Sequence, residues 1–211
     1  EFRPETFYTV QLALDGFTAS SEKFQKREEA ETVQKSCVAA TVVKAAQAEK
    51  TEKPPALYDL TSLQREANRL LGYTAQQTLD YAQSLYEKKL VTYPRTDSRY
   101  LTEDMALGLP ALVNMVAHVC KENAGETVPV HSELVINNKK VTDHHAIIPT
   151  REVQHYKLDS LPNGEQAVLR LISKRLCMAV GELYRYAETV VELEAGGTKF
   201  TAKGKTELEK G

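Results

Sequence analysis

Cysteine is scarce in this sequence, and long apolar runs are absent. Cys37, Cys120 and Cys177 are scattered and form no CxxC pair, which argues against a disulfide scaffold or a zinc site and favours a reducing compartment. No apolar run approaches the roughly 20 residues that a membrane-spanning helix needs. The chain opens on polar residues without an initiator methionine, so we expect no signal peptide, and we expect a piece of a longer protein.

Neither sign of charge dominates the composition. Lys and Arg total 27 and Asp and Glu total 29, so a net charge of -2 provides no overall attraction to nucleic acid. Any such binding must come from local clusters. Hydrophobic residues make up 42% and charged residues 27%, as in ordinary soluble globular proteins. A chain of 211 residues can bury one good core or two small ones.

The patterns along the chain predict strands at both ends and helices between them. Pro54 and Pro55 mark an extended connector before the helical part, because each residue that precedes a proline is pushed out of the helical region. The elements expected at the two ends are strands at 7–14 and 17–21, a short charged helix at 26–37, and a hairpin around Gly196 and Gly197.

This order predicts an α+β fold in which a helical domain is inserted into a β domain. We expect residues 1–58 to form a β-rich segment, residues 59–186 the helical domain, and residues 187–211 a hairpin that returns to the β domain. No internal repeat or low-complexity tract interrupts this division.

Two helices joined by a tight turn are expected directly after the connector. The first, residues 61–72, stops at Gly72, and the second, residues 73–89, restarts at once with Thr74 and Gln77 as a capping box. This is a helix-turn-helix signature, and with the strand-like stretch that follows it predicts a winged-helix-like domain. The side chains expected to face the core are Leu63, Ala67, Leu70 and Leu71 in the first helix, and Leu79, Ala82, Leu85 and Tyr86 in the second.

Further helices are expected in the second half. Residues 102–122 predict two helical pieces, because Pro110 is acceptable in a first helical turn but not in mid-helix. Residues 163–182 predict the longest helix. The side chains expected to face inward from it are Ala167, Leu171, Cys177 or Met178, and Val180.

The segment "LVTYPRTDSRYL", residues 90–101, brings a tyrosine and two arginines together. If it is extended, Tyr93 and Arg95 point to the same side, and Pro94 favours such a backbone. A phenol, with an unperturbed pKa of about 10, becomes a useful nucleophile when a cation stabilises the phenolate, and arginine also suits a phosphate. The pattern alone leaves two interpretations open: a half-buried tyrosine in a basic wing, or a nucleophile beside a phosphate clamp.

Positive charge is concentrated around this segment. The cations Lys88, Lys89, Arg95 and Arg99 are opposed by Asp97 alone, a local surplus of +3 in a chain that is net negative. A tyrosine beside such a cluster predicts a phosphotyrosyl intermediate and reversible breakage of a nucleic-acid backbone.

A second segment, "DHHAIIPT", carries adjacent histidines at positions 144 and 145. Neighbouring side chains on an extended chain point to opposite sides, so we expect one histidine to face a site and the other to pack or be solvated. Histidine is the usual proton donor or phosphate partner near neutral pH. A metal site is a weaker interpretation, because Asp143 and the two histidines lack a separated third ligand group.

At these two segments, and in the helix-turn-helix that precedes them, the chain resembles the central part of type IA DNA topoisomerases, especially the bacterial topoisomerase III branch. The TYPRTDS and DHHAIIPT motifs follow the helix-turn-helix in the order typical of that family, and the resemblance covers most of the chain. It implies an arch-like β domain that carries an inserted helical domain. It also implies an ATP-independent enzyme that cleaves and rejoins one DNA strand through a 5′-phosphotyrosyl bond.

The resemblance also implies roles for individual residues. Tyr93 matches the nucleophile, Arg95 the arginine that holds the scissile phosphate, and His144 the histidine that contacts a phosphate or assists proton movement. Nine further residues are expected to contact DNA or support the site. They are Ser62, Gln64, Arg65, Lys88, Lys89, Thr96, Asp97, Ser98 and Arg99.

The family's catalytic Mg²⁺ belongs to a Toprim domain, and this sequence has no DxD pair and begins downstream of where that domain would lie. We therefore expect no metal site in this segment, Mg²⁺ only in the full-length enzyme, and no relaxation of supercoils by the segment alone. The implied partners are single-stranded DNA and a cellular helicase, with no membrane. The expected protein is a monomer in the bacterial cytoplasm, associated with the nucleoid.

Two other function classes remain alternatives at this stage. A non-catalytic winged-helix DNA-binding module would prefer duplex DNA and would be indifferent to loss of the Tyr93 hydroxyl. A metal phosphoesterase built on "DHH" would need several further separated acidic and histidine ligands, whereas Asp15, Asp59 and Asp80 stand in unrelated contexts.

Overall fold

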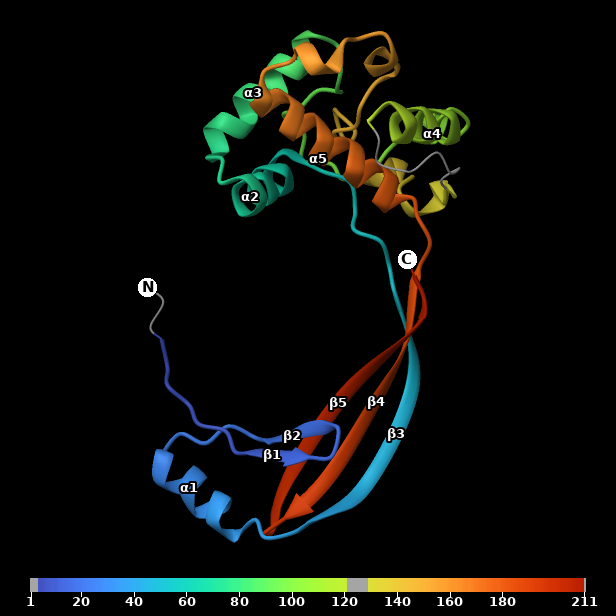
Figure 1. Cartoon of the computed structure of the whole chain (residues 1–211). Helices are drawn as coiled ribbons and strands as arrows, with labels where there is room; N and C mark the ends of the chain where they lie inside the picture. The colour runs from blue at the N-terminus through green and yellow to red at the C-terminus, as the bar shows by residue number, and fades with distance from the viewer. Residues whose placement is uncertain (1–3, 121–128, 211) are drawn as a thin grey trace. The chain divides into compact units, whose positions relative to one another are not determined.

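The computed structural model describes residues 4–120 and 129–210, which divide into two units (Figure 1). One unit contains the chain up to Glu52 together with Tyr184–Lys210, and the other contains Lys53–Leu183. The first holds a sheet and one helix, and the second holds four α-helices. This is the α+β class that the sequence predicts. None of the described helices is long and apolar enough to cross a membrane.

Five antiparallel strands form one sheet in the order β1-β2-β5-β4-β3. Their bounds are β1 Gln11–Leu14, β2 Phe17–Ser21, β3 Ala40–Glu52, β4 Tyr184–Ala195 and β5 Thr198–Glu209. β3 and β4 are neighbours although the whole helical unit lies between them in the chain. The predicted hairpin at Gly196 and Gly197 is confirmed, and positive φ angles of 56° and 76° give it the backbone of a type I′ turn.

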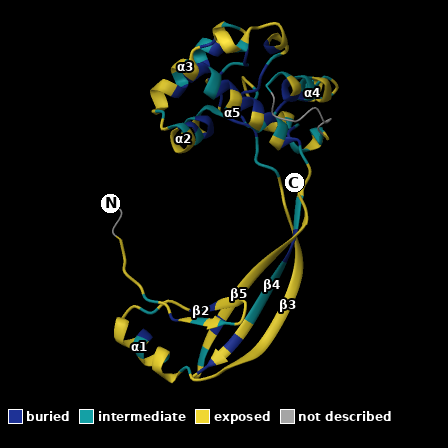
Figure 2. Ribbon diagram, viewed as in Figure 1, coloured by how far each residue is buried: buried dark blue, intermediate teal, exposed yellow. Residues whose placement is uncertain are grey.

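Cross-strand charge pairs support the long part of the sheet, where little is buried. Every residue of β3 is exposed (Figure 2). Lys44 of β3 lies opposite Glu192 of β4, and Lys205 of β5 lies opposite Glu188. Opposite charges in such positions stabilise a sheet, although solvent screening keeps each exposed pair below about 1 kcal/mol. These pairs therefore matter more for the register between β3, β4 and β5 than for the stability of the sheet.

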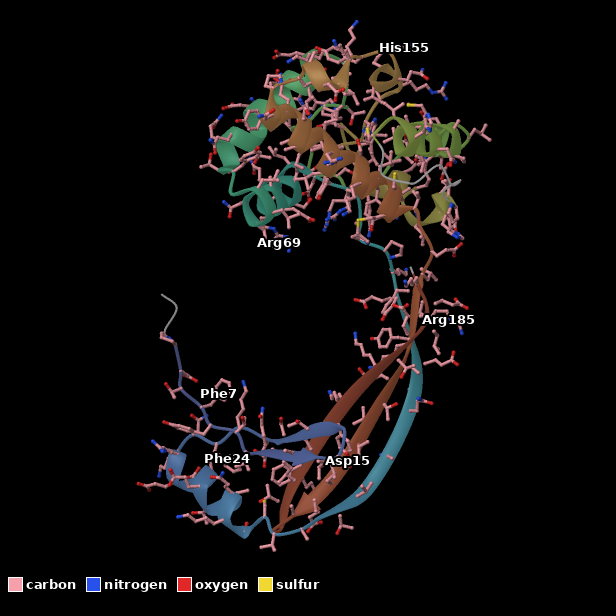
Figure 3. All side chains as sticks on the ribbon, in the orientation of Figure 1. Phe7, Asp15, Phe24, Arg69, His155 and Arg185 are labelled. Atoms are coloured by element: carbon pink, nitrogen blue, oxygen red, sulfur yellow. The ribbon has the colours of Figure 1, made fainter. Side chains whose placement is uncertain are left out.

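Arg185, labelled in Figure 3, joins β4 to both of its neighbours in the sheet. Its guanidinium is 2.9 Å from Glu49 of β3 and 2.8 Å from Glu209 of β5. The hydrogen bond to Glu49 and the two negative charges raise the pKa of Arg185 above its usual range. The residue is thus a cross-strand tie at the start of β4.

The sheet unit buries a small core where α1 (Arg27–Ser36) and the β1–β2 hairpin meet the turn end of β4 and β5. α1 occupies the range predicted from its charged pattern. Phe200 is the largest fully buried side chain of this core. Its other buried members are Val10, Ala19, Ala30, Leu193, Ala195 and Ala202.

The helical unit is built around α5 (Asn163–Ala179), which contacts α2, α3 and α4 (Figure 1). Its other helices are α2 Leu60–Leu71, α3 Ala75–Glu87 and α4 Leu109–Val119. Short 3₁₀ turns lie at Glu103–Met105, Ser132–Leu134, Asn138–Lys140, Arg151–Gln154 and Leu158–Ser160. Pro110 stands in the first turn of α4, as predicted, and the last two residues of the predicted helical stretch, 121 and 122, lie outside the described residues.

Side-chain caps explain where α2 and α3 begin. Thr74 and Gln77 form the predicted capping box of α3: the hydroxyl of Thr74 accepts from the Gln77 amide, and the Gln77 side chain accepts from the Thr74 amide. Asp59 and Ser62 form an equivalent box at α2. α2 ends at Gly72, whose φ of 72° is the left-handed geometry of a helix C-terminus.

Several predicted core positions are wrong. Leu70 and Tyr86 are exposed by 51% and 39%, whereas Leu63, Ala67, Ala82 and Leu85 are fully buried as predicted. In α5 the buried stripe runs one residue away from the predicted one. It consists of Gly164, Glu165, Val168, Leu169, Ile172, Ser173, Leu176 and Ala179, while Met178 is exposed. Val180, directly after the helix, is fully buried as predicted.

The shifted stripe of α5 has a physical cause. It includes two polar residues, which the sequence pattern assigns to the surface. The Glu165 carboxylate accepts from the Ser84 hydroxyl at 2.8 Å, and the Ser173 hydroxyl is 3.3 Å from the Cys120 sulfur. Because partners on other helices satisfy these groups, they can be buried without a large desolvation penalty.

The boundaries between the units differ from the predicted ones. They fall after Glu52 and before Tyr184 rather than after residues 58 and 186. Leu57 and Tyr58 belong to the helical unit because both are fully buried in its core. Tyr184 belongs to the sheet because it pairs with Glu52.

Gly164 makes a close contact that predicts a stability effect. A Cβ at this position would lie 2.3–2.6 Å from ring carbons of Tyr81, although alanine is otherwise the better helix former. We expect Gly164→Ala to lower the free energy of unfolding of the helical unit by about 1–3 kcal/mol, measured by urea denaturation with circular dichroism. Gly204→Ala, whose Cβ would meet nothing within 4 Å, is the control. An unchanged or raised stability in Gly164→Ala would contradict the close packing.

His131 predicts a pH dependence. Its Nε2 is 3.1 Å from Glu182 and its Nδ1 is 3.1 Å from Glu133, and these hydrogen bonds, that of Glu182 first, raise the pKa of His131. The pairing of His131 with the two glutamates therefore contributes fully to stability below about pH 6.5, the pKa of histidine in the unfolded chain. This contribution is lost as the pH rises through the pKa of His131 in the folded chain. An NMR titration of the His131 ring should give a midpoint above 6.5, and Glu182→Gln should lower it. A midpoint at or below 6.5 in the native chain would refute the paired arrangement.

Candidate active site

Hydrogen bonds from Thr92 join the two segments that the sequence singles out. The Thr92 amide donates to the Ile148 carbonyl at 2.9 Å, and the Thr92 hydroxyl accepts from the Ile148 amide at 3.0 Å. The same hydroxyl donates to the Ala146 carbonyl at 3.0 Å. One threonine thereby satisfies three backbone groups and fixes residue 93 beside the histidine segment.

Tyr93 lies against His144. The two ring centroids are 4.3 Å apart, with 42° between the ring planes. On another side Tyr86 meets Tyr93 at nearly a right angle, with the centroids 5.4 Å apart. Tyr93 is half-buried and His144 is exposed, so the phenol and the imidazole form one surface that solvent reaches.

The backbone around Tyr93 is not a regular strand, contrary to the strand or wing expected there. Val91 forms an isolated bridge with Pro149, and no ladder follows it through residue 100. Burial nevertheless alternates: Thr96 and Ser98 are buried, while Arg95 and Asp97 are exposed. Irregular chain can hold this alternation because side-chain hydrogen bonds replace the missing ladder.

Thr96 and Ser98 make internal contacts. The Thr96 hydroxyl donates to the His144 carbonyl at 2.9 Å and accepts from the Ser98 amide at 3.0 Å. The Ser98 hydroxyl donates to the Lys140 carbonyl at 2.8 Å. Of the three consecutive polar residues expected to contact DNA, these two hold the loop, and only Asp97 is exposed.

The basic residues separate into engaged and open groups. Lys88 is 2.9 Å from the buried carboxylate of Glu165 and also donates to Ser84. Arg99 is half-buried and donates from Nε to the Leu57 carbonyl at 3.2 Å. The side chains of Arg95 and Lys89 are exposed, and neither has an ion pair or hydrogen bond within the described chain. Lys89 and Arg95 are thus the cations best able to accept an external anion.

The three residues expected at the start of α2 do not gather at Tyr93 through any described contact. Ser62 is buried in the capping box with Asp59. Gln64 donates to the Ala75 carbonyl at 3.0 Å and so braces the turn between α2 and α3. Arg65 is exposed on α2.

His145 turns away from the phenol, as expected for one of two adjacent histidines. Its Nδ1 lies 2.8 Å from the Ala146 carbonyl, and the residue is half-buried. Within residues 4–120 and 129–210, no group of three or more His, Cys, Asp and Glu side chains could hold a metal ion. Among the described residues, the candidate site brings a phenol and an imidazole together, with two open cations close to the phenol in the sequence.

Sequence reasoning missed the support beneath the histidine segment. The Tyr58 carbonyl accepts from the Ile147 amide at 2.9 Å, and the Arg175 guanidinium lies 4.2 Å from the centre of the Tyr58 ring. Burial of the phenol raises the pKa of Tyr58 to about 12. Arg175 is held in turn by Glu66 and by the Ala56 carbonyl at 3.0 Å. No local motif signals this stack, because its members come from three distant segments.

Comparison with known proteins gives consistent results. A sequence model described as DNA topoisomerase matches residues 1–211. DNA topoisomerase 3 from Bacillus subtilis is 37% identical over the whole chain, and the enzyme of that name from Bacillus licheniformis is 35% identical. The chain spans about 30% of the length of each relative.

A solved structure shares the fold. Full-length topoisomerase I from Thermotoga maritima superposes with a TM-score of 0.71 at 24% identity, covering 96% of this chain and 34% of that one. The family match over all residues, together with the whole-chain identity to the Bacillus proteins, decides the assignment. The chain belongs to the DNA topoisomerase family, as a topoisomerase III-like segment of the type IA class.

Proposed function

We propose that this chain is the tyrosine-bearing part of an enzyme that cleaves and rejoins one strand of DNA. The observation that carries the proposal is the contact between Tyr93 and His144, at 4.3 Å between ring centroids, two residues before the exposed Arg95, whose guanidinium has no ion pair or hydrogen bond within the described residues. Single-stranded DNA is the proposed substrate because the type IA family to which the chain belongs is consistent with it.

In the proposed reaction the Tyr93 oxygen attacks the scissile phosphorus and loses its proton. The bond between phosphorus and the 3′ oxygen breaks, and the 3′ oxygen leaves as a hydroxyl after it takes up a proton. The phosphate stays joined to the 5′ oxygen and to Tyr93. Rejoining is the reverse attack by the 3′-hydroxyl, so no external energy source is required.

The neighbouring groups have distinct proposed roles. The Arg95 guanidinium stays charged at all working pH values and presents a planar fork of donors, which suits the charge that builds on the phosphate oxygens. The proposed role of the His144 imidazole is to contact a phosphate oxygen or the moving proton, and its ring contact with Tyr93 supports this role. Thr92 acts indirectly, since its three hydrogen bonds keep the two segments in register.

Mg²⁺ is proposed for the full-length enzyme, held outside this segment. The described residues offer no cluster that fits a divalent cation, so no step of the mechanism above is routed through a metal. A cellular helicase and the oligomeric state are likewise properties of the whole enzyme.

One prediction of the proposed function concerns the nucleophile. In a longer type IA protein that contains this chain, Tyr93→Phe should abolish the covalent adduct with an end-labelled single-stranded oligonucleotide and leave binding within about twofold. The adduct is scored after a detergent quench with Mg²⁺ present. Tyr156→Phe, at another exposed tyrosine, is the matched control and should leave the adduct unchanged. An adduct that survives Tyr93→Phe would rule out this nucleophile, and binding with no adduct in the native protein would favour a non-catalytic DNA-binding module.

The second prediction concerns the open cations. If Lys89 and Arg95 each contact one phosphate, log K for single-stranded DNA should fall with log salt at a slope of about -1.4, at about 0.7 per contact. Arg95→Ala should reduce that slope by about 0.7. The control is Arg27→Ala, which removes the same charge from α1 in the other unit. Fluorescence anisotropy of a labelled oligonucleotide measures both, and a slope near zero would exclude this surface.

A further inference from the structure

An open pocket lies beside Tyr93 and has no role in the mechanism above. It has a volume of about 520 Å³ and is bounded by the end of α3, by Tyr93 and by Thr150. Its lining includes the aromatic residues Tyr86 and Tyr93 and the charged residues Glu87 and Lys89. The pocket therefore combines aromatic and apolar groups with a few charged ones, a pattern typical of a small-molecule subsite.

Tyr86 is the least expected part of this pocket. Its position on the apolar stripe of α3 predicts burial, but 39% of the residue is exposed and its ring meets only the ring of Tyr93 among the described aromatic contacts. An exposed tyrosine ring is a rigid platform on which a planar group can stack. Because it touches the proposed nucleophile, that group would belong to the nucleotide being cleaved.

Lys89 has the backbone of a glycine. With φ at 61°, it is the sole non-glycine residue in the described chain with a positive φ. Its amide donates to the Tyr86 carbonyl, and the Leu90 amide donates to the Leu85 carbonyl, which is the pattern of a Schellman motif that glycine usually completes. A lysine there costs about 1 kcal/mol relative to glycine, and it gives the pocket lining a cationic residue.

Glu87 distinguishes a base from a phosphate as the occupant. Its exposed carboxylate, which accepts from Gln83 at 3.1 Å, would repel a phosphate inside the pocket. It could instead accept a hydrogen bond from the exocyclic amine of a base. The cations that suit a phosphate, Lys89 and Arg95, are both exposed; Lys89 lines the pocket, whereas Arg95 is not among its lining residues.

We propose that this pocket binds one nucleobase of the cleaved strand, stacked on Tyr86, while Lys89 contacts the adjoining phosphate. The inference rests on the proposed function and deepens it, because it makes the pocket a positioning subsite for the nucleotide next to the scissile phosphate. Base stacking supplies binding free energy that holds that phosphate in line with the Tyr93 hydroxyl.

The first test measures binding without chemistry. Anisotropy with a labelled 15-nucleotide single strand should show about 5- to 100-fold weaker binding by Tyr86→Ala, the usual range for loss of one base–aromatic stack. Tyr86→Phe should restore the affinity, because it keeps the ring. Tyr156→Ala is the matched control, since Tyr156 is 36% exposed, close to the exposure of Tyr86. Equal affinities for Tyr86→Ala and the native chain would overturn the proposal.

The Lys89→Gly variant distinguishes the backbone strain at residue 89 from the proposed role of its side chain in DNA binding. It should raise the Tm of the helical unit by about 2–4 °C, because it relieves the left-handed strain, and it should weaken DNA binding at the same time. A purely structural lysine predicts the higher Tm with unchanged binding, and that result would remove Lys89 from the subsite.

The last test determines which nucleotide of the substrate occupies the pocket. In the longer protein, a substrate with a mapped cleavage site is scanned with single abasic positions, and the oligonucleotide concentration that gives half-maximal adduct is measured. One position beside the scissile phosphate should show a 5-fold or larger increase, and Tyr86→Ala should abolish that dependence. If adduct forms and the half-maximal concentration is the same for every abasic position, the proposed base-binding pocket is refuted, but the proposed cleavage is not. Absence of any adduct, with Tyr86-dependent binding intact, overturns the proposed cleavage and leaves the base site standing.

Discussion

The hydrogen bonds of Thr92 are the constraint on which the candidate site depends. Residues 91–98 form no ladder with a neighbouring strand, so nothing regular fixes the direction of the Tyr93 side chain. Thr92 supplies three bonds to residues 146–148, each worth about 1 kcal/mol net, and Thr96 adds one to the His144 carbonyl. The segment carrying the phenol and the segment carrying the imidazole therefore behave as one body.

The basic residues around Tyr93 share a sign of charge but not a task. Lys88 neutralises the buried carboxylate of Glu165 and so links α3 to α5. The side chains of Lys89 and Arg95 have no ion pair or hydrogen bond within the described residues, and Lys89 is held in a backbone conformation that stability alone would give to glycine. The local surplus of positive charge in the sequence thus separates into cations that hold the fold together and cations that are available to a ligand.

Strong local signals gave correct predictions. The capping box at Thr74, the stop at Gly72, the break at Pro110 and the glycine hairpin each depend on residues a few positions apart, and each is confirmed. Predictions that depended on distant partners were weaker. The inward face predicted for α5 was wrong, except at Val180, because Glu165 and Ser173 have partners in Ser84 and Cys120. The exposure of Tyr86 was missed because the pocket it lines is completed by residues that follow α3, from Lys89 to Tyr93, and by Thr150.

The sequence by itself determined the helix boundaries, the α+β class and the two motifs that carry Tyr93, Arg95 and His144, because these follow from local propensity and from the identity of a few residues. Only the tertiary structure decided which polar side chains are open to a ligand. Some polar residues are engaged within the fold, namely Thr96, Ser98, Ser62 and Lys88. The sequence does not distinguish them from Arg95 and Lys89, whose side chains are open. Whether a polar group is free depends on what distant segments bring to it, and one-dimensional spacing does not contain that information.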